Sequence, residues 1–512
     1  MMFRYGMCCL LLLSSQFLQA AEGQRIEVRG VTVLSTAEVD GIVGAYSGRE
    51  VFAEDIAAMI NAFNNLYASK GYINSGMTFP EQAASSALVL QAVEGDLSRV
   101  DVQSSGRLSK DHIAAVIRSE ISRPLNINEL QTAFSRLEQE STIESVRGRL
   151  EPGVKPGEAS LVLDVMEADA FSVDLRANNY RSPSVGSEQA QVQLNHINLT
   201  GHSDVLSIGL NVTEGMDSGS IYYSVPVSAL KSRIAAFYST GDTLVVEAPF
   251  DAISLKSETD TAGVSIETRF VDSLTRTIST SIGLEKKTSD TSLLGLPFDF
   301  TPGSVNGQSK ATVVVGSVSY QQRSRQQALA AKLTLRQGID AMGATISSTG
   351  AADGKFSLWQ LQLSYIQLFE RNGYDWTFSV AANSQFTNDT LQAFERFPLG
   401  GHGSIRGYRE NQALRDQSWE IRTQLEMPLY QSVDGNSRFS LYPFVDVGEG
   451  RNAQAEDNVR QTVNLSSVGL GMNYTYSAFR ANLEWAQRLQ EKTKQGNTLQ
   501  DKGIYVGVSY AL

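Results

Sequence analysis

The most extensive pattern in the chain is an alternation of apolar and polar residues that starts after residue 170 and continues to the C-terminus. The run Trp359-Gln360-Leu361-Gln362-Leu363 is one example, and the last residues, 504–512, alternate in the same way. A period of two residues indicates β-strands with one apolar face. Polar and glycine-rich turns separate these segments, so residues 169–512 are predicted to form one long series of antiparallel strands.

The polar positions of these strands are mostly Gln, Ser, Asn, Gly and Thr, with few charges. This composition is typical of the water-filled lumen of a transmembrane β-barrel, whereas the polar face of a soluble β-sandwich would carry many charges. At roughly 20 residues per strand and connection, the region holds about 16 strands. We expect residues 357–369 to be one membrane strand. Four tyrosines are expected at the interfacial girdles: Tyr222, Tyr223, Tyr442 and Tyr474.

Residues 25–167 have a different pattern, and it occurs twice. One face of the predicted helix 53–70 carries apolar residues at helical spacing: Ile56, Met59, Ile60, Phe63, Leu66 and Tyr67. The first unit is predicted to contain a strand, two helices and two strands, at 26–33, 35–46, 53–70, 72–78 and 88–94. The second repeats this order at 99–103, 109–119, from Asn126 onward, 143–150 and 160–167. Each unit is therefore a small α+β domain, with boundaries expected at 21–95 and 96–168.

Small mixed sheets have exposed edge strands, which can accept an added strand from another polypeptide. The arm could therefore capture a client, or it could be an inert spacer. The candidate client-binding residues lie around the end of the second helix of the first unit: Tyr67, Tyr72, Ile73 and Met77.

The first twenty residues have the features of a secretory signal peptide: one basic residue, a short apolar stretch and the small-residue site Leu18-Gln19-Ala20. The apolar stretch is too short to span a bilayer as a helix, which needs roughly 20 residues. Cys8 and Cys9 lie inside this segment, so a mature chain would have no cysteine chemistry. We expect cleavage near Ala20 or Ala21.

The composition and motifs argue against an enzyme and against a nucleic-acid-binding protein. The formal net charge is −12, and no concentrated basic patch is present. The four histidines, among them His402, show no metal-ligand spacing and are expected to be isolated surface or turn residues. Gly-x-Ser-x-Gly and phosphate-loop motifs are absent. We therefore predict no catalytic residues, no cofactor and no metal.

One glycine-dense segment, 397–408, contains the run Gly403-Ser404-Ile405-Arg406-Gly407-Tyr408. A later strand, Phe444-Val445-Asp446-Val447-Gly448, places an aspartate among apolar residues and glycine. If the earlier segment folds into the barrel, Arg406 could form a two-pronged ion pair with Asp446, for which arginine is better suited than lysine. Composition alone favours the alternative, a solvated surface arginine and an ordinary strand aspartate.

Taken together, these motifs resemble the TpsB family, the outer-membrane transporters of two-partner secretion, which are relatives of the barrel-assembly insertases. Residues 404–408 resemble the family's loop-six tip, and Phe444, Asp446 and Gly448 resemble its paired strand motif. Residues 150–163 are similar to the end of the family's second POTRA (polypeptide-transport-associated) domain. Residues 198–204 are similar to a turn early in its barrel.

This resemblance implies two periplasmic POTRA domains and a 16-stranded outer-membrane barrel, with the loop bearing Arg406 in the pore against Asp446. The client would be a large secreted exoprotein of the TpsA kind, often an adhesin or haemolysin, threaded outward unfolded and without ATP. The other expected partners are outer-membrane lipid and, during biogenesis, the barrel-assembly machinery. We expect a monomer.

Many members of the family carry an N-terminal plug helix, but here only residues 21–24 precede the first predicted strand. We therefore expect the loop bearing Arg406 to be the main closure of the pore, and the pore to leak more than plugged relatives. Three other functions stay open: an outer-membrane insertase of the same superfamily, a passive porin and, least favoured, a soluble secreted enzyme.

Overall fold

The structure is a computed structural model that describes residues 25–80, 87–104, 106–228, 231–300, 303–347, 352–454, 462–490 and 496–512. The predicted signal peptide and the expected absence of a plug helix concern residues outside these ranges. The chain divides into two compact units. The smaller unit is built mainly from the N-terminal residues, and the larger unit contains the barrel.

The first α+β module is a three-stranded sheet with two helices. The sheet order is β1-β3-β2, with β1 parallel and β2 antiparallel to the central strand β3. Its elements are β1 Arg25–Arg29, α1 Thr36–Val43, α2 Ala53–Ser69, β2 Gly76–Thr78 and β3 Ala87–Val93. Helix α1 starts after Ser35, whose backbone N–H donates to the Glu38 carboxylate at 3.0 Å, as in a capping box.

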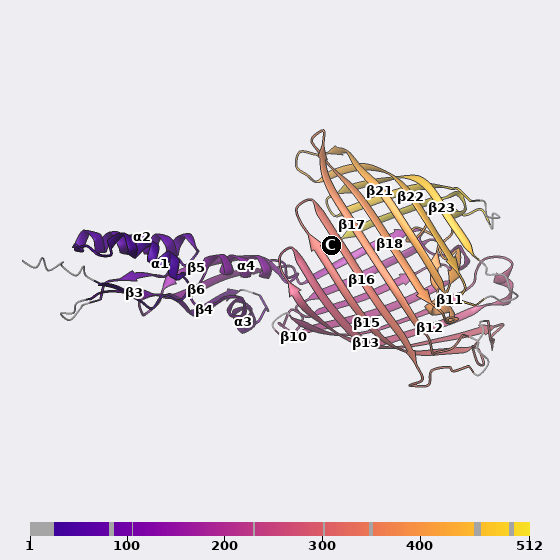
Figure 1. The fold of residues 1–512 in the computed structure, drawn as a ribbon. Helices are drawn as coiled ribbons and strands as arrows, with labels where there is room; N and C mark the ends of the chain where they lie inside the picture. Colours follow the sequence, from indigo (N-terminus) through magenta and orange to yellow (C-terminus); the bar gives the residue numbers. More distant parts are fainter. Residues whose placement is uncertain are drawn as a thin grey trace, which may run out of the picture. The chain divides into compact units, whose positions relative to one another are not determined.

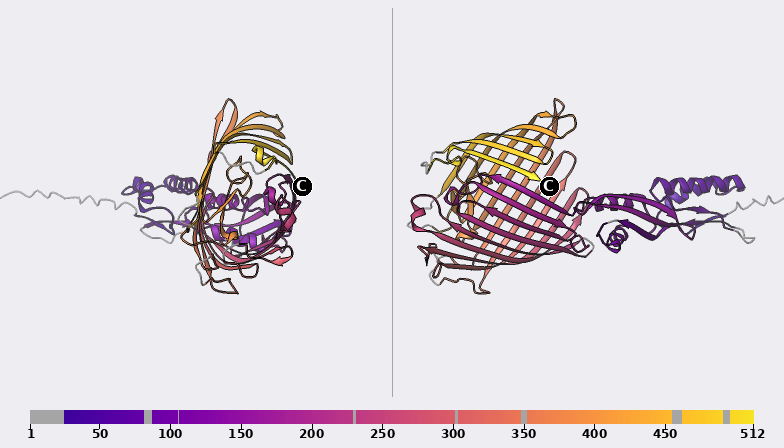
Figure 2. Two further views of the ribbon diagram at one scale, coloured as in Figure 1. Left: turned by 90° about the vertical axis from the view of Figure 1, so that its right-hand side faces the viewer. Right: turned by 180° about the vertical axis from the view of Figure 1, so that it is seen from behind.

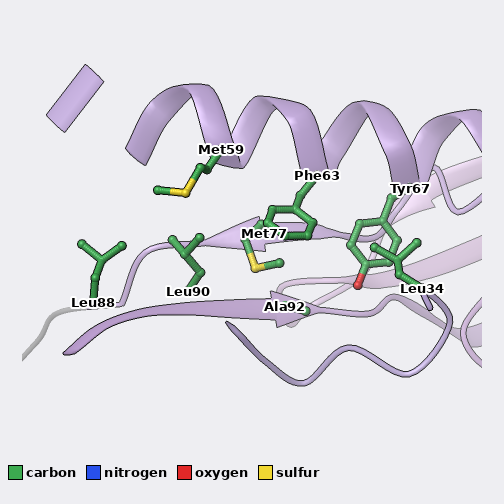
Figure 3. Close-up of a cluster of buried hydrophobic side chains, with 8 residues drawn as sticks. All are labelled: Leu34, Met59, Phe63, Tyr67, Met77, Leu88, Leu90 and Ala92. Carbon is green, nitrogen blue, oxygen red and sulfur yellow. The ribbon is translucent and has the colours of Figure 1, made fainter. Parts of the chain in front are cut away.

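The core of this module lies between α2 and the sheet (Figure 3). Met59, Phe63 and Tyr67 follow one another at four-residue intervals on α2 and are completely buried. They point toward apolar side chains of the sheet, such as Leu88 and Leu90. Burying each large apolar side chain contributes roughly 1.5–3 kcal/mol, so this stripe explains why α2 is stable as a helix.

The second module has the sheet order β4-β6-β5 and again two helices. Its elements are β4 Asp96–Ser104, α3 Lys110–Glu120, α4 Ile127–Leu137, β5 Ile143–Pro152 and β6 Glu158–Glu167. The predicted repeat of two α+β modules is thus confirmed. Across the described ranges, no helix is both long and apolar enough to cross a membrane.

The rest of the chain forms a closed antiparallel barrel, which confirms the predicted fold (Figures 1 and 2). In the described residues the wall has sixteen long strands and the short β14, and it closes where β25 pairs with β7. The long strands are β7 Phe171–Asn178, β8 Gln189–Ile197, β9 Val205–Val212, β10 Met216–Ser228, β11 Ser232–Leu244, β12 Lys256–Asp272, β13 Arg276–Leu293, β15 Gln308–Arg323, β16 Gln327–Ile339, β17 Ser357–Arg371, β18 Tyr374–Thr387, β21 Gln417–Gln431, β22 Ser437–Arg451, β23 Val463–Tyr476, β24 Phe479–Arg488 and β25 Ile504–Ala511; β14 is Leu296–Pro297.

The two sides of the wall differ as the alternation predicts. In β22, Val445 is 48% exposed on the outer surface, whereas its neighbour Asp446 is completely buried on the inner surface. The expectation that Tyr442 lies in an outer aromatic girdle is wrong, because Tyr442 shares the inner parity of Asp446 and is buried. Tyr222 also faces inward, since it shares the parity of the buried Ser224 on β10, whereas Ile221 is exposed on the other face.

The remaining girdle tyrosines agree with the prediction in their parity. Tyr474 is exposed on the same outer face of β23 as Leu470, and Tyr223 shares the outer face of β10 with Ile221. Aromatic residue type alone therefore did not reveal which side of the wall a tyrosine faces.

The connections alternate between two ends of the barrel. We call the end at which β7 begins the entry end, and the opposite one the far end. Counted from β7, the connection between β18 and β21 is the sixth at the far end. The turn at 198–204, which resembles a family motif, lies at the entry end and is ordered by two bonds to the Asp204 carboxylate, from the Thr200 N–H at 2.9 Å and the Thr200 hydroxyl at 2.7 Å.

Candidate functional site

The candidate site is the long connection 388–416, here called loop six. In the left view of Figure 2 its orange chain lies inside the ring of strands. The short strands β19 Phe397–Leu399 and β20 Ala413–Arg415 pair antiparallel and form a hairpin stem. Gly400 and Gly407 have φ values of +96° and +94°, which favour glycine and allow the tip to turn sharply. The hairpin therefore holds the tip, 400–412, against the inner wall.

The guanidinium of Arg406 pairs with the carboxylate of Asp446. Nε donates to Oδ2 at 2.7 Å and Nη2 donates to Oδ1 at 2.8 Å, which is the two-pronged geometry of a strong arginine–carboxylate pair. The backbone N–H of Arg406 also donates to Oδ2, at 3.1 Å. The structure thus brings together the two residues that the sequence proposed as partners; their role in transport stays a prediction.

Three further residues surround the same guanidinium. Its Nη1 donates to Glu484 Oε1 and to Gln424 Oε1, both at 3.1 Å. The Arg406 Cζ lies 3.5 Å from the centre of the Phe444 ring, a cation–π contact. Arg406 is only 4% exposed, so each donor must find a partner inside the protein. The site therefore fixes the loop tip by charge, hydrogen bonds and ring stacking together.

The other residues of the predicted motif pack around this ion pair. Ile405 and Tyr408 are completely buried in an apolar cluster with Leu399. The Gly407 N–H donates to the Tyr505 hydroxyl at 3.0 Å. The Tyr408 hydroxyl donates to the Ser466 carbonyl at 3.0 Å.

Two smaller residues complete this fit. Ser404 bonds through its hydroxyl to the Glu420 carboxylate of the wall. A side chain at Gly448 would come within 2.6 Å of the Ile405 methyl group, which explains why the wall has glycine there.

Several functional candidates were missed by sequence reasoning. Glu484 accepts bonds from the Tyr442 hydroxyl at 2.9 Å and pairs with His402 Nδ1 at 2.8 Å, besides its bond from Arg406. His402 also stacks on Tyr180 with ring centroids 3.7 Å apart. It is thus not the isolated turn residue that was expected. Single Glu, Tyr and His residues on strands and turns carry no sequence signal, because their partners are more than 40 residues away.

Another ionic contact holds the far side of the tip. Arg409 Nε and Nη2 donate to the two oxygens of Asp501 at 2.7 and 2.8 Å, and its Nη1 lies 2.8 Å from Glu247. These partners belong to two other connections at the far end of the barrel. The loop tip is therefore joined to neighbouring connections as well as to the wall.

Two of the four candidate client-binding residues are buried, so the structure does not bring these four together as a surface. Tyr67 and Met77 are buried in the core of the first module, so the prediction that they contact a client directly is wrong. Their apolar character, which suggested a binding surface, serves core packing. Tyr72 packs against that core and is half-buried. Ile73 is 53% exposed, and a client-binding role for it stays a prediction.

The chemistry available at the site is ionic and structural. Arg406 is paired with Asp446 and Glu484, whereas Glu410 Oε2 is buried without a hydrogen-bond partner. The described residues contain no cluster of three or more His, Cys, Asp or Glu side chains suited to a metal ion. What the arrangement can do is hold a loop inside a wide barrel and release it.

The sequence pattern of the family described as "Haemolysin secretion/activation protein ShlB/FhaC/HecB" matches residues 157–474, and that of the "POTRA domain, ShlB-type" matches residues 22–95. Among similar proteins, outer membrane transporter CdiB-2 of Burkholderia pseudomallei (strain 1026b) is 22% identical, covering 79% of this chain and 68% of the relative. Heme/hemopexin transporter protein HuxB of Haemophilus influenzae (strain 86-028NP) is 22% identical, with coverage of 86% and 78%. Hemolysin transporter protein HpmB of Proteus mirabilis is 19% identical, with coverage of 95% and 85%.

Solved structures agree in fold. CdiB from Escherichia coli superimposes with a TM-score of 0.70 at 17% identity, covering 98% of this chain and 93% of the other. BamA from Haemophilus ducreyi lacking POTRA domains 1–3 gives 0.57 at 11% identity, covering 96% and 100%. The fold is thus shared with both CdiB and BamA, and the family pattern covers more than half of the residues of this chain. The chain belongs to the ShlB/FhaC/HecB family of haemolysin secretion/activation proteins and is an outer-membrane transporter of partner exoproteins, not an enzyme.

Proposed function

We propose that this chain exports one large exoprotein, of the adhesin or haemolysin kind, from the periplasm to the cell surface through its barrel lumen, with loop six as the closure. The relatives are named as transporters of hemolysin and of heme/hemopexin, which supports a cargo of this class. The entry end of the barrel then faces the periplasm and the far end faces the outside. The chain acts as a monomer, surrounded by outer-membrane lipid and inserted by the barrel-assembly machinery.

The observation that carries this proposal is the buried Arg406–Asp446 pair inside a lumen wide enough for an aqueous channel. A barrel that served only as a membrane anchor would not need a loop fixed in its lumen by a completely buried carboxylate. A client that enters the lumen must move this loop aside. Because the pair is made of a few directional contacts, it can be broken and re-formed without unfolding the barrel.

The α+β modules are the proposed capture sites. Among the described residues, the outer strands of each sheet pair with another strand on one side only, and an extended client segment can add to such an edge by backbone hydrogen bonds. The edge strands β4 and β5 have nine and ten residues, whereas β1 and β2 have five and three. The longer edges of the second module offer more backbone groups, so we assign the main capture edge to that module.

The second candidate function is insertion of other outer-membrane proteins, which the fold shared with BamA favours. The experiment that separates the two is expression of this chain with the secreted exoprotein encoded beside its gene. Export predicts that the exoprotein becomes accessible to protease added outside the cells only when this chain is present. Retention of the exoprotein in the periplasm, together with loss of unrelated outer-membrane proteins on depletion of this chain, would favour insertion.

A further inference from the structure

Loop six has a second buried ionic contact. It is formed by the first limb of the loop, residues 388–396, which lead from β18 to the hairpin stem, and not by the tip. Glu395, in the 3₁₀ turn Ala393–Glu395, is 5% exposed. Its Oε1 lies 2.8 Å from Lys287 Nζ of β13, and its Oε2 accepts from Arg336 Nε of β16 at 3.0 Å. Arg336 Nη2 also donates to Glu395 Oε1 at 3.2 Å. Two cations of the wall therefore bind one carboxylate of the loop.

Apolar packing accompanies this contact. Leu391 is completely buried among Val313 and Leu358 of the wall and Phe356, which directly precedes β17. Phe394 packs against the same cluster. The Glu395 backbone carbonyl accepts from Gln385 Nε2 at 2.9 Å. A charged residue buried in this way is costly to leave unpaired, which indicates that the limb is held firmly against the wall.

The two contacts lie on opposite sides of the strand pair that loop six connects. The barrel order is β13-β14-β15-β16-β17-β18-β21-β22-β23-β24, and loop six leaves the wall at β18 and returns at β21. Glu395 is bound by β13 and β16 on one side, whereas Arg406 is bound by β22 and β24 on the other. The residues between them, 396–405, are thus fixed at both ends inside the barrel.

We propose that Glu395 is a positioning residue of the closure. Loop six is bound to the barrel wall at two separate positions, and the pore opens fully only when both contacts are broken. This inference rests on the proposed closure by loop six. The inference goes beyond that proposal because it assigns part of the closure to Lys287 and Arg336, which lie on other strands than the partners of Arg406. Release of the tip alone would leave the first limb in the lumen.

The chain offers a matched control. Glu285 of β13 also binds Arg336, at 2.8 Å from Nη2, and this contact joins one wall strand to another. Glu395→Gln and Glu285→Gln therefore each remove one negative charge from the same cluster, and only the first releases the limb. Lys287→Gln provides an intermediate case, since it leaves the two bonds from Arg336 to Glu395.

The test is the current through the full-length chain in planar lipid bilayers, with heat-modifiable migration as the check that each variant is folded. We expect the open fraction to rise about ten-fold in Glu395→Gln, less in Lys287→Gln and not in Glu285→Gln. Two results would contradict the proposed role of the Glu395 contact in closure. One is an unchanged current in both Glu395→Gln and Lys287→Gln, and the other is an equal rise of the current in Glu285→Gln.

Arg406→Ala serves as the reference for the closure itself. If Arg406→Ala raises the current and Glu395→Gln does not, only the proposed role of the Glu395 contact is refuted. If neither variant raises the current, closure by loop six fails as well, whatever the outcome for export.

Discussion

Arg406 binds Asp446 through its main chain and its side chain at once, with hydrogen bonds of 3.1, 2.7 and 2.8 Å from the backbone N–H, Nε and Nη2. A single carboxylate thus fixes the direction of the backbone at the loop tip as well as the position of the guanidinium. A lysine could supply charge but neither the planar fork nor the stacking on Phe444.

Arg406→Ala should abolish export of the partner exoprotein, because a loop that cannot re-form its pair with Asp446 does not return to its place after a client has moved it. A heat-modifiable barrel should stay in the membrane, because the barrel hydrogen bonds do not depend on the loop. Arg406→Lys should retain only a small part of wild-type export, since it keeps the charge and loses the fork. The measurement is surface-accessible exoprotein per barrel. Undiminished export by Arg406→Ala would remove the loop from the mechanism.

The two carboxylates around Arg406 should differ in how much they contribute to export and to closure of the pore. Asp446 accepts three hydrogen bonds from Arg406 and Glu484 accepts one, and hydrogen bonds to charged groups contribute about 1.5–3 kcal/mol each. We therefore expect Asp446→Asn to reduce export more than Glu484→Gln and to raise the bilayer current more. Export and current recordings of the two variants side by side check the order, and the reverse order would contradict the assigned geometry.

The first module should lose stability in acid through Glu94. Burial would raise the pKa of the Glu94 carboxyl, but hydrogen bonds from Thr32, Val33 and Tyr67 outweigh burial and lower it. A lowered folded-state pKa stabilises the module above the unfolded value of about 4.3, and this stabilisation is lost as the pH falls below it. The protection factor of α2 against hydrogen exchange, which removes the pH dependence of the intrinsic amide exchange rate, should therefore fall below about pH 4 in the full chain.

The control for this prediction is Glu94→Gln, which cannot titrate. Its α2 should exchange faster than wild type at neutral pH, with a loss of about 1–2 kcal/mol, and should lack the component of acid sensitivity that comes from Glu94. An α2 that keeps the full wild-type acid response in this variant would show that other groups are responsible.

The seam between β7 and β25 allows export to be separated from lateral insertion. Arg176 and Ser509 lie directly opposite each other, at a position that alternates with the hydrogen-bonded pair Val173–Leu512. Cα atoms at such positions are about 4.5 Å apart, within disulfide range. The pair Arg176→Cys and Ser509→Cys should therefore lock the seam and leave export unchanged, because the client passes through the lumen. Loss of export on oxidation, restored by reductant, would favour a lateral route.

The alternation of residue types was sufficient to predict the barrel, since each strand repeats the same two-residue pattern with apolar side chains outward. The helices of the first module were predicted from the spacing of Met59, Phe63 and Tyr67, which the structure shows in the core. The same residues show the limit of this reasoning. Tyr67 was assigned both to an apolar helix face and to a client surface, and only packing decides between them.

The site itself was only partly predictable. Arg406 and Asp446 stood out because their motifs resemble those of a family. Glu484 and Glu395 did not, because one carboxylate on a strand or turn looks the same whether it is solvated or paired. Their roles depend on which strands the closed barrel brings opposite loop six, and this register is a property of the tertiary fold.

The central claim, that loop six closes the lumen and must move for export, is tested most directly by tethering the loop. The Ser404 hydroxyl bonds to the Glu420 carboxylate of the wall, so Ser404→Cys with Glu420→Cys can be joined by a short, reducible bis-thiol crosslinker. The measurement is the amount of surface-accessible exoprotein before and after reduction, with each single cysteine variant as control. We predict that export stops in the crosslinked chain and resumes after reduction. Export at the uncrosslinked rate from a fully crosslinked chain would contradict the claim.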